Sequence, residues 1–254
     1  MINLLRTELF KLSKNKIFWT LILIATVVFA LLHILITIGW WKMDNLYMEA
    51  GLELFSSLPL ATAPFYFMLF LSTFAGFFVA NDFTIGVVKN IVMSGNRRSH
   101  IFLAKFIVLV LGSVMLTVAC PLIVITGGKL LFGFGEMTDP SALGFLARGM
   151  GLFLIHMLAC VALLMLIALL AEDSGKTIII SVVIALLISV AEVLRPLPGI
   201  LDALYRYSIF HHLIDSFRMV MTAPDMIQSL SVGLGTLLIV MWCGNLAFKR
   251  KEIK

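Results

Sequence analysis

One short run in the chain has the residue types that bind a nucleotide phosphate. Ser174–Thr177 reads SGKT, which matches the end of a P-loop. A P-loop also needs a glycine five residues before its last glycine, so that backbone N–H groups can cradle the phosphates. This chain has Leu170 at that position, inside an apolar run and not after a strand. We therefore interpret Lys176 as the charged end of a transmembrane span, with Asp173 or Ser174 as the helix cap, and expect no nucleotide site.

Histidines inside apolar runs are the next candidates for chemistry. His33 and His156 both lie in such runs, where an ionisable group is by default a functional candidate, as a haem ligand or a proton carrier. A histidine bonded to a neighbouring helix carbonyl is commoner, and we favour that interpretation. His211 and His212 could bind a metal, but adjacent helix residues point about 100° apart. We therefore expect these two on a surface.

Nucleophilic catalysis and metal binding find no support elsewhere in the sequence. The three cysteines, Cys120, Cys160 and Cys243, lie inside apolar runs and lack the paired spacing of a disulfide framework or a zinc site. Serine, histidine and aspartate do not occur at the spacing of a catalytic motif. We expect a chain that is not an enzyme and holds neither cofactor nor metal.

Composition places the elements that carry these residues in a membrane. The chain has 254 residues, of which 61% are hydrophobic and 13% charged, and its mean hydropathy is +1.08. Soluble domains are about one quarter charged, and a run of about 18 apolar residues is long enough for a transmembrane helix. We expect one all-α polytopic domain, 1–254, with six transmembrane spans at 17–40, 60–79, 101–131, 147–170, 177–194 and 226–248.

The segments between and beside the spans have distinct expected roles. Residues 1–16 form an amphipathic helix on the inner membrane surface, with Lys11 and Lys14 toward anionic headgroups. Residues 195–225 are apolar but broken by charges and prolines, which predicts short re-entrant helices. Pro121 removes a backbone donor and predicts a kink in the third span. Glu192 and Arg195 can pair at the end of the fifth span as a possible gate.

Lysine and arginine counts predict the orientation. With both termini on one side, 13 of the 19 lysines and arginines lie on that side and 6 lie opposite. Positively charged residues accumulate on the cytoplasmic side of membrane proteins. We expect a multi-pass protein of a bacterial plasma membrane with both termini in the cytoplasm. The net charge of +5 follows this topology and needs no nucleic-acid partner.

The polar stretch 81–105 separates the second and third spans. Wound as a helix, it places Ile85, Val88 and Val92 beside Val87 and Ile91 in one apolar stripe. Asn81 or Asp82 can cap its start and Gly95 can end it. Two interpretations remain: a helix that lies on the membrane surface, or a helix that is offered to a soluble partner. The opposite face carries Gly86, Lys89, Asn90 and Met93.

The chain resembles the permease subunit of ABC-2 type exporters, in the small six-span group. Three segments carry the resemblance: Glu8–Leu12 followed by Lys14–Trp19, the stretch Phe77–Lys105, and Pro196–Pro224 between the last two spans. Within Phe77–Lys105 the family-like residues are Asn81-Asp82-Phe83, Gly86, Lys89-Asn90, Ser94-Gly95, Arg97-Arg98 and Lys105.

The resemblance implies a partner and a mechanism. Residues 82–99 would be a coupling helix seated in a cytosolic ATPase subunit, which binds the ATP and Mg²⁺. Two permeases, identical or paralogous, would assemble with two ATPases in the lipid bilayer, and the inner-surface helix would contribute Glu8, Lys11 and Lys14. The implied coupling residues are Asp82, Phe83, Ile85, Val87, Val88, Lys89, Asn90, Ile91, Val92, Ser94, Arg97 and Arg98.

The resemblance also suggests a cargo. Members similar to this chain export bacitracin, lantibiotics or phenol-soluble modulins, which implies amphipathic, antimicrobial-peptide-like or hydrophobic cargo and a role in antimicrobial resistance. Sodium, drugs and a lipid-linked glycan are alternative cargoes. Two other functions compete: a membrane redox subunit with His33 and His156 as haem ligands, and a membrane scaffold without transport activity.

Overall fold

The fold is a bundle of helices. The computed structural model describes residues 1–37, 64–132, 142–194, 200–218 and 220–251, and this part of the chain contains no strand. The all-α class is therefore confirmed. In chain order the elements are α1 (Ile2–Lys14), α2 (Lys16–Thr37), α4 (Pro64–Ala75), the π-helix Gly76–Ala80, α5 (Asn81–Thr84), α6 (Val87–Met93), α7 (Arg98–Phe132), α8 (Ala142–Ala171), α9 (Ser174–Val193), α10 (Ile200–Arg206), α11 (Ile209–Asp215) and α12 (Ala223–Arg250).

Several helices are long and apolar enough to cross a membrane. Within the described residues these are Arg98–Val118, Gly144–Ala171, Ser174–Glu192 and Ala223–Arg250. Met68–Thr84 and Val87–Met93 make a fifth candidate if the pair, bent by 61°, is one span. The multi-pass membrane protein is thus confirmed. The six-span count stays a prediction, because the first expected span, 17–40, ends outside the described residues.

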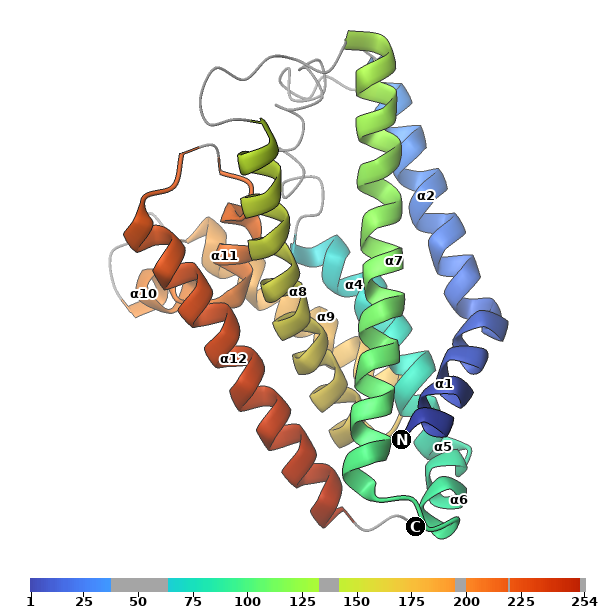
Figure 1. Ribbon diagram of the computed structural model, residues 1–254. Coiled ribbons are helices and arrows are strands. Elements are labelled where there is room, and N and C mark those ends of the chain that lie inside the picture. The colour runs from blue at the N-terminus through green and yellow to red at the C-terminus, as the bar shows by residue number, and fades with distance from the viewer. Residues whose placement is uncertain (38–63, 133–141, 195–199, 219, 252–254) are drawn as a thin grey trace.

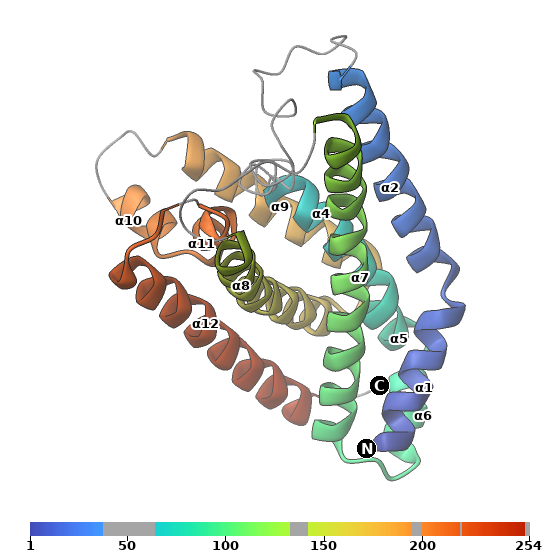
Figure 2. The same cartoon turned by 45° about the horizontal axis from the view of Figure 1, so that its top comes forward.

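Helix α8 forms the centre of the bundle. It packs against α12, α9, α11, α4 and α7, and Figure 2 shows it enclosed by these neighbours. In its most apolar stretch 67% of the residues are buried, compared with 11% in α12 and 17% in α9. The outward faces of α9 and α12 are apolar, which suits contact with lipid.

Helices α1 and α2 complete one side of the bundle by packing against α7, which is far from them in the sequence. Helix α2 packs along α7, and α1 packs against the first turns of α7 (Figures 1 and 2). The start of α1 and the end of α12 both lie near α6 (Figure 1). We call this region the α6 end of the bundle. It is the place where most of the residues of the expected coupling region meet.

Short helices occupy the expected re-entrant segment. Helices α10 and α11 fall within 195–225, and α12 starts at a capping box in which Thr222 and Asp225 exchange side-chain-to-backbone bonds.

Helices α8 and α12 extend beyond the expected spans 147–170 and 226–248, because their helical backbone continues past the apolar runs. Glu192 is half-buried on α9, whereas Arg195 lies outside the described residues, so the gate pair stays a prediction. Pro121 lies within α7, but its side chain is outside the described set, so the kink is also untested.

Candidate functional site

The polar stretch 81–105 does not form one helix. The chain leaves α4 through the π-helix, ends α5 at Thr84, and turns at Gly86, whose φ of 71° is a left-handed conformation that glycine adopts readily. Helix α6 follows and is terminated by Gly95 at φ 84°, as the sequence predicts. The expected helix over 82–99 is therefore wrong in its bounds. Gly86 breaks it, and α7 already begins at Arg98.

Helix α6 has one anchored face and one exposed face. Val88 is fully buried, and Ile91 and Val92 pack partly buried against the core, as the stripe predicts. Ile85 is 61% exposed, which corrects its place in the stripe: it precedes the Gly86 turn and is out of register with α6. Val87 is half-buried at the first position of the helix. The exposed face, called the α6 outer face below, comprises Ile85, Lys89, Asn90, Met93, Ser94 and Arg97.

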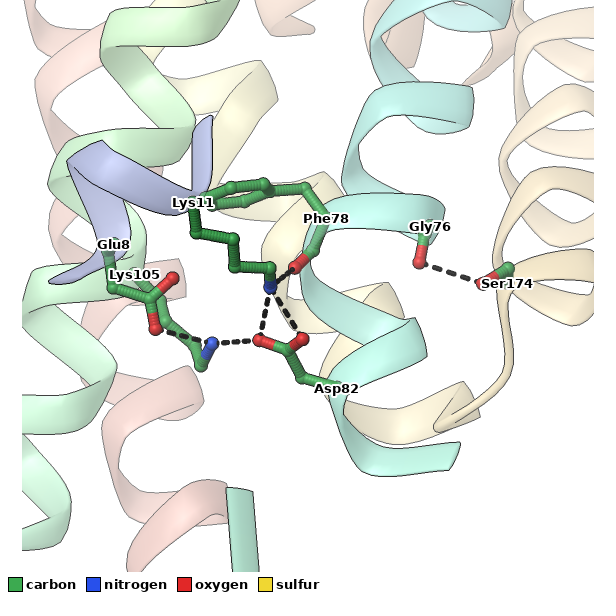
Figure 3. A network of polar contacts seen from close by, with 7 residues as sticks. All are labelled: Glu8, Lys11, Gly76, Phe78, Asp82, Lys105 and Ser174. Carbon is green, nitrogen blue, oxygen red and sulfur yellow. Dashed lines mark hydrogen bonds and ion pairs between the residues drawn. The ribbon is translucent and has the colours of Figure 1, made fainter. Parts of the chain in front are cut away.

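Four charged side chains form a buried cluster beside α6. Lys11 of α1 donates to Asp82 Oδ1 of α5 at 2.5 Å and to the Phe78 carbonyl oxygen of the π-helix at 2.8 Å (Figure 3). Lys105 of α7 contacts the same Asp82 carboxylate and donates to Glu8 Oε1 at 2.7 Å. We call Glu8, Lys11, Asp82 and Lys105 the charge cluster. It joins three helices that are far apart in sequence.

The cluster is electrically balanced and largely withdrawn from solvent. Asp82 and Lys105 are each 1% exposed. Burial of the ammonium lowers the pKa of Lys11, and the nearby Lys105 lowers it further, while Asp82 acts in the opposite direction. A buried ion costs several kcal/mol unless its partner is close and well oriented. Lys105 lies between Glu8 and Asp82, and Asp82 lies between Lys105 and Lys11, so the four charges form a chain of three ion pairs.

This arrangement corrects two expectations. Asp82 does not cap a coupling helix, because α5 continues from the preceding helical turns and its carboxylate points into the cluster. Helix α1 exists as expected, but Glu8 is buried against Lys105 of α7 and Lys11 is bonded to Asp82 of α5, so neither side chain points toward headgroups. Lys14 is exposed and lies over the Phe10 ring.

A second set of contacts ties the end of α12 to the same region. Arg98 donates to the carbonyl oxygens of Lys249 at 3.0 Å and Lys251 at 2.5 Å, which supplies donors to the last turn of α12. Lys251 pairs with Glu172 at 2.7 Å and lies 5.4 Å from the centre of the Phe83 ring. We call Phe83, Arg98, Glu172 and Lys251 the tail lock.

The tail lock resolves which arginine is available to a partner. Arg98 is engaged with α12, whereas Arg97 is exposed. Phe83 is also occupied inside the bundle, because its ring packs edge-on against Phe248 at 6.1 Å. Of the expected coupling residues, Asp82, Phe83 and Arg98 therefore hold α5 and α6 in position. Lys89, Asn90, Ser94 and Arg97 remain accessible.

The P-loop-like run serves as a helix start. Asp173 accepts a hydrogen bond from the Lys176 backbone N–H at 2.8 Å, which caps α9 as expected. The Ser174 hydroxyl donates to the Gly76 carbonyl oxygen at 2.9 Å, so this turn also fixes α9 against the π-helix (Figure 3). Lys176 itself is exposed. These roles account for the serine and the aspartate without a nucleotide.

His156 makes the helix contacts that the sequence favours. Its Nδ1 lies 2.8 Å from the Leu152 carbonyl oxygen and its Nε2 lies 3.1 Å from that of Ser229 on α12. Both ring nitrogens therefore face backbone oxygens, and neither is free to bind an iron. The His33 side chain lies outside the described set. His212 is buried and stacks on His156 at 5.7 Å, so the expected surface position is wrong for it.

Sequence reasoning missed the charge cluster although a signal for it exists. A lysine inside a transmembrane run needs an acidic partner. Glu8 and Asp82 are carboxylates bordering apolar runs, but which of them Lys105 meets depends on helix packing.

Comparison with known proteins identifies a family. Residues 4–192 match the family model described as "ABC-2 family transporter protein". No curated protein matches the sequence. The match begins in α1 and ends in α9, so it contains the charge cluster, α6 and the α8–α9 turn.

Proposed function

Because this chain belongs to the ABC-2 transporter family and is a membrane transport subunit of an ABC system, we propose that it is the permease of an ATP-driven exporter coupled through α6. A separate cytosolic ATPase binds the ATP and Mg²⁺. Two copies of that ATPase serve this chain and a second permease, which is identical or paralogous. In this proposal the α6 end of the bundle and both termini face the cytoplasm.

The observation that carries this proposal is the anchored position of α6. Val88 fixes one face in the core, while Lys89, Asn90 and Met93 stand on the exposed face. A polar, charged edge beside an exposed apolar side chain suits a groove on a soluble partner. A helix lying on a membrane would instead place its apolar face outward toward lipid, and the apolar face of α6 is turned into the bundle.

The surrounding contacts suit α6 for transmitting force. The charge cluster joins α5 to α1 and α7, and the tail lock joins the end of α12 to α5 and the start of α7. A displacement of α6 by the ATPase would thus reach α1, α7 and α12 together. Nucleotide-driven closure of the ATPase pair would tilt the bundle as one body and change access to a path between the two permeases.

The proposed cargo is amphipathic or hydrophobic, and peptides with antimicrobial activity are the leading class. Support comes from the composition: 61% of the residues are hydrophobic and 20 of them are phenylalanine. A transport path lined by hydrophobic and aromatic side chains would favour apolar cargo over sugars or ions. Export of such peptides would protect the cell that makes or meets them.

The first test is recovery of the partner with the tagged full chain. We expect a stoichiometric cytosolic P-loop ATPase to co-purify from native membranes, identified by mass spectrometry. Lys89→Glu on the α6 outer face should lower the recovered ATPase at least tenfold. Lys249→Glu is the matched control, because it makes the same charge change at an exposed position at the end of α12 and should not alter recovery.

A second variant separates anchoring from contact. Val88→Asp places a carboxylate in the buried face of α6, so it should uncouple ATP hydrolysis from transport and lower the melting temperature of the permease. Lys89→Glu should change partner recovery and leave the melting temperature unaltered. Full ATPase recovery with Lys89→Glu together with coupled transport by Val88→Asp, or a haem-bearing partner in place of the ATPase, would overturn the proposal.

A further inference from the structure

A polar pocket lies where α11 meets the start of α12. Its volume is about 250 Å³. In Figure 1 the short helix α11 and the first turn of α12 lie at the end of α12 remote from α6. The pocket is lined by Arg206, His211, His212, Asp215, Arg218, Met221, Asp225 and Gln228. None of these residues belongs to the charge cluster or the tail lock, so the pocket requires its own explanation.

The two carboxylates of the pocket share one guanidinium. Arg206 pairs with Asp202 at 2.9 Å, one helical turn away on α10. Arg218 is shared between Asp215 at 3.2 Å and Asp225 at 3.7 Å. The second distance exceeds that of a good hydrogen bond. Asp202 lies outside the lining and occupies Arg206, so Arg218 is the guanidinium that faces both carboxylates of the lining, Asp215 and Asp225.

His212 adds an unpartnered nitrogen to the same lining. His212 is 6% exposed, and its Nε2 has no hydrogen-bond partner within the described part of the chain. One ring face is covered by His156 of α8, with centroids 5.7 Å apart, and His211 lies at 5.3 Å. Burial lowers the pKa of His212, and His211 lowers it further, so the ring is neutral near pH 7. A neutral imidazole has one acceptor nitrogen.

These observations specify a ligand group. An ammonium has one positive charge and three N–H donors. Asp215 and Asp225 share the positive charge of Arg218, which leaves one negative charge to match the ammonium. With a neutral imidazole whose Nε2 carries no proton, they provide three acceptor groups. A simple anion would meet Asp215 and Asp225 with repulsion, and an apolar group would leave His212 Nε2 unpaired.

We propose that this pocket binds a primary ammonium group, held by Asp215, Asp225 and His212. Two sources carry that group: the headgroup of phosphatidylethanolamine and the free amine of a peptide. The site does not depend on the proposed docking of an ATPase at α6, because it lies at the other end of α12 and involves other helices.

Ethylamine is the probe for the shared chemistry. The full chain, purified in nanodiscs of phosphatidylglycerol and labelled with ¹⁵N-histidine, is titrated with ethylamine while the His212 resonance is followed. His212→Gln assigns that resonance. We expect a saturable shift with ethylamine and none with tetramethylammonium, which carries the charge without N–H donors. An equal shift with both cations would show nonspecific attraction and overturn the proposal.

Variants locate the site on the carboxylates. Asp225→Asn should weaken ethylamine binding at least tenfold, while its amide oxygen can still accept the Thr222 N–H that starts α12. Asp215→Asn should act in the same direction. Glu192→Gln removes a carboxylate outside the lining and should leave affinity unaltered. Unchanged binding in both aspartate variants, with unchanged melting temperatures, would also contradict the proposal.

Two further arms distinguish the sources. Nanodiscs with phosphatidylethanolamine should reproduce the His212 shift if the lipid is the ligand, whereas phosphatidylcholine should not. A Leu-Leu dipeptide with a free amine, compared with its N-acetylated form, tests the peptide source. An ethylamine shift that neither source reproduces still supports an ammonium site and assigns it to another amine.

Discussion

Lys105 of α7 and Asp82 of α5 form an ion pair in which each residue is 1% exposed. The pair fixes α5, the short helix that leads into α6, to the first turns of α7, the long helix that follows α6. Glu8 and Lys11 complete its charge balance from the opposite side. The segment between Asp82 and Lys105, which includes α6, is thereby closed into a loop with a fixed base.

Asp82→Asn should destabilise the permease strongly. The change leaves two ammoniums facing one carboxylate in a buried site, for which a loss of about 3–5 kcal/mol is typical. Thermal unfolding of the purified chain in detergent measures the effect. The control is Asp202→Asn in the more exposed Arg206 pair, where about 1 kcal/mol or less is expected. Equal destabilisation by the two variants would mean that the cluster contributes no special stability.

Arg98→Gln should release the end of α12. The guanidinium donates to the Phe248 and Lys249 carbonyl oxygens of that helix and to that of its C-cap residue Lys251, and its loss leaves them without these donors. Hydrogen exchange of residues 244–251 should accelerate about tenfold, corresponding to about 1.4 kcal/mol. Arg97→Gln is matched in type and neighbouring in sequence but exposed, so it should leave this exchange unchanged. Similar exchange in both variants would argue against the tail lock.

Gly233→Ala should separate α12 from α8. A Cβ at position 233 would lie 2.7 Å from Ile155 Cγ2 and 3.1 Å from His156 Nε2. Overpacking of this kind costs about 1–3 kcal/mol. Gly235→Ala, on the same helix and with open space around the new Cβ, should instead be neutral or stabilising by up to about 1 kcal/mol. The comparison of melting temperatures decides, and a stabilised Gly233→Ala would show that the two helices do not approach so closely.

Acid should loosen the α8–α11 contact through His212. Burial lowers the pKa of His212 below the usual 6.5; His211 lowers it further and Asp215 raises it. The unfolded chain therefore binds more protons than the folded one as pH falls below 6.5, so stability is complete above that value and declines below it. His156 faces the ring from α8, and Arg218 and Asp225 lie around the same pocket.

The pH dependence is checked by unfolding at pH 7.5 and pH 5. His212→Gln should reduce the difference between the two, whereas His100→Gln, on a histidine at the start of α7, should retain it. If the wild-type protein and the His212 variant lose stability in parallel, protonation elsewhere is responsible.

Several features of the fold were predictable because they depend on local sequence. Gly95 ends α6, Asp173 caps α9, and Val88 lies on the buried face of its helix. Each of these follows from residues within a few positions of one another. The predicted stripe misplaces Ile85 because it assumes one continuous helix through Gly86, and a glycine in a helical pattern does not by itself reveal a turn of the chain.

The amino-acid sequence alone determined that this chain is helical and crosses a membrane, since apolar runs of sufficient length have no other stable state in a bilayer. Tertiary structure decided which charges meet. Asp82 finds partners 71 positions earlier and 23 positions later in the chain, and no periodicity encodes such separations. The pairing arises when α1, α5 and α7 pack together, because a buried ion selects the nearest opposite charge that the packing brings within reach.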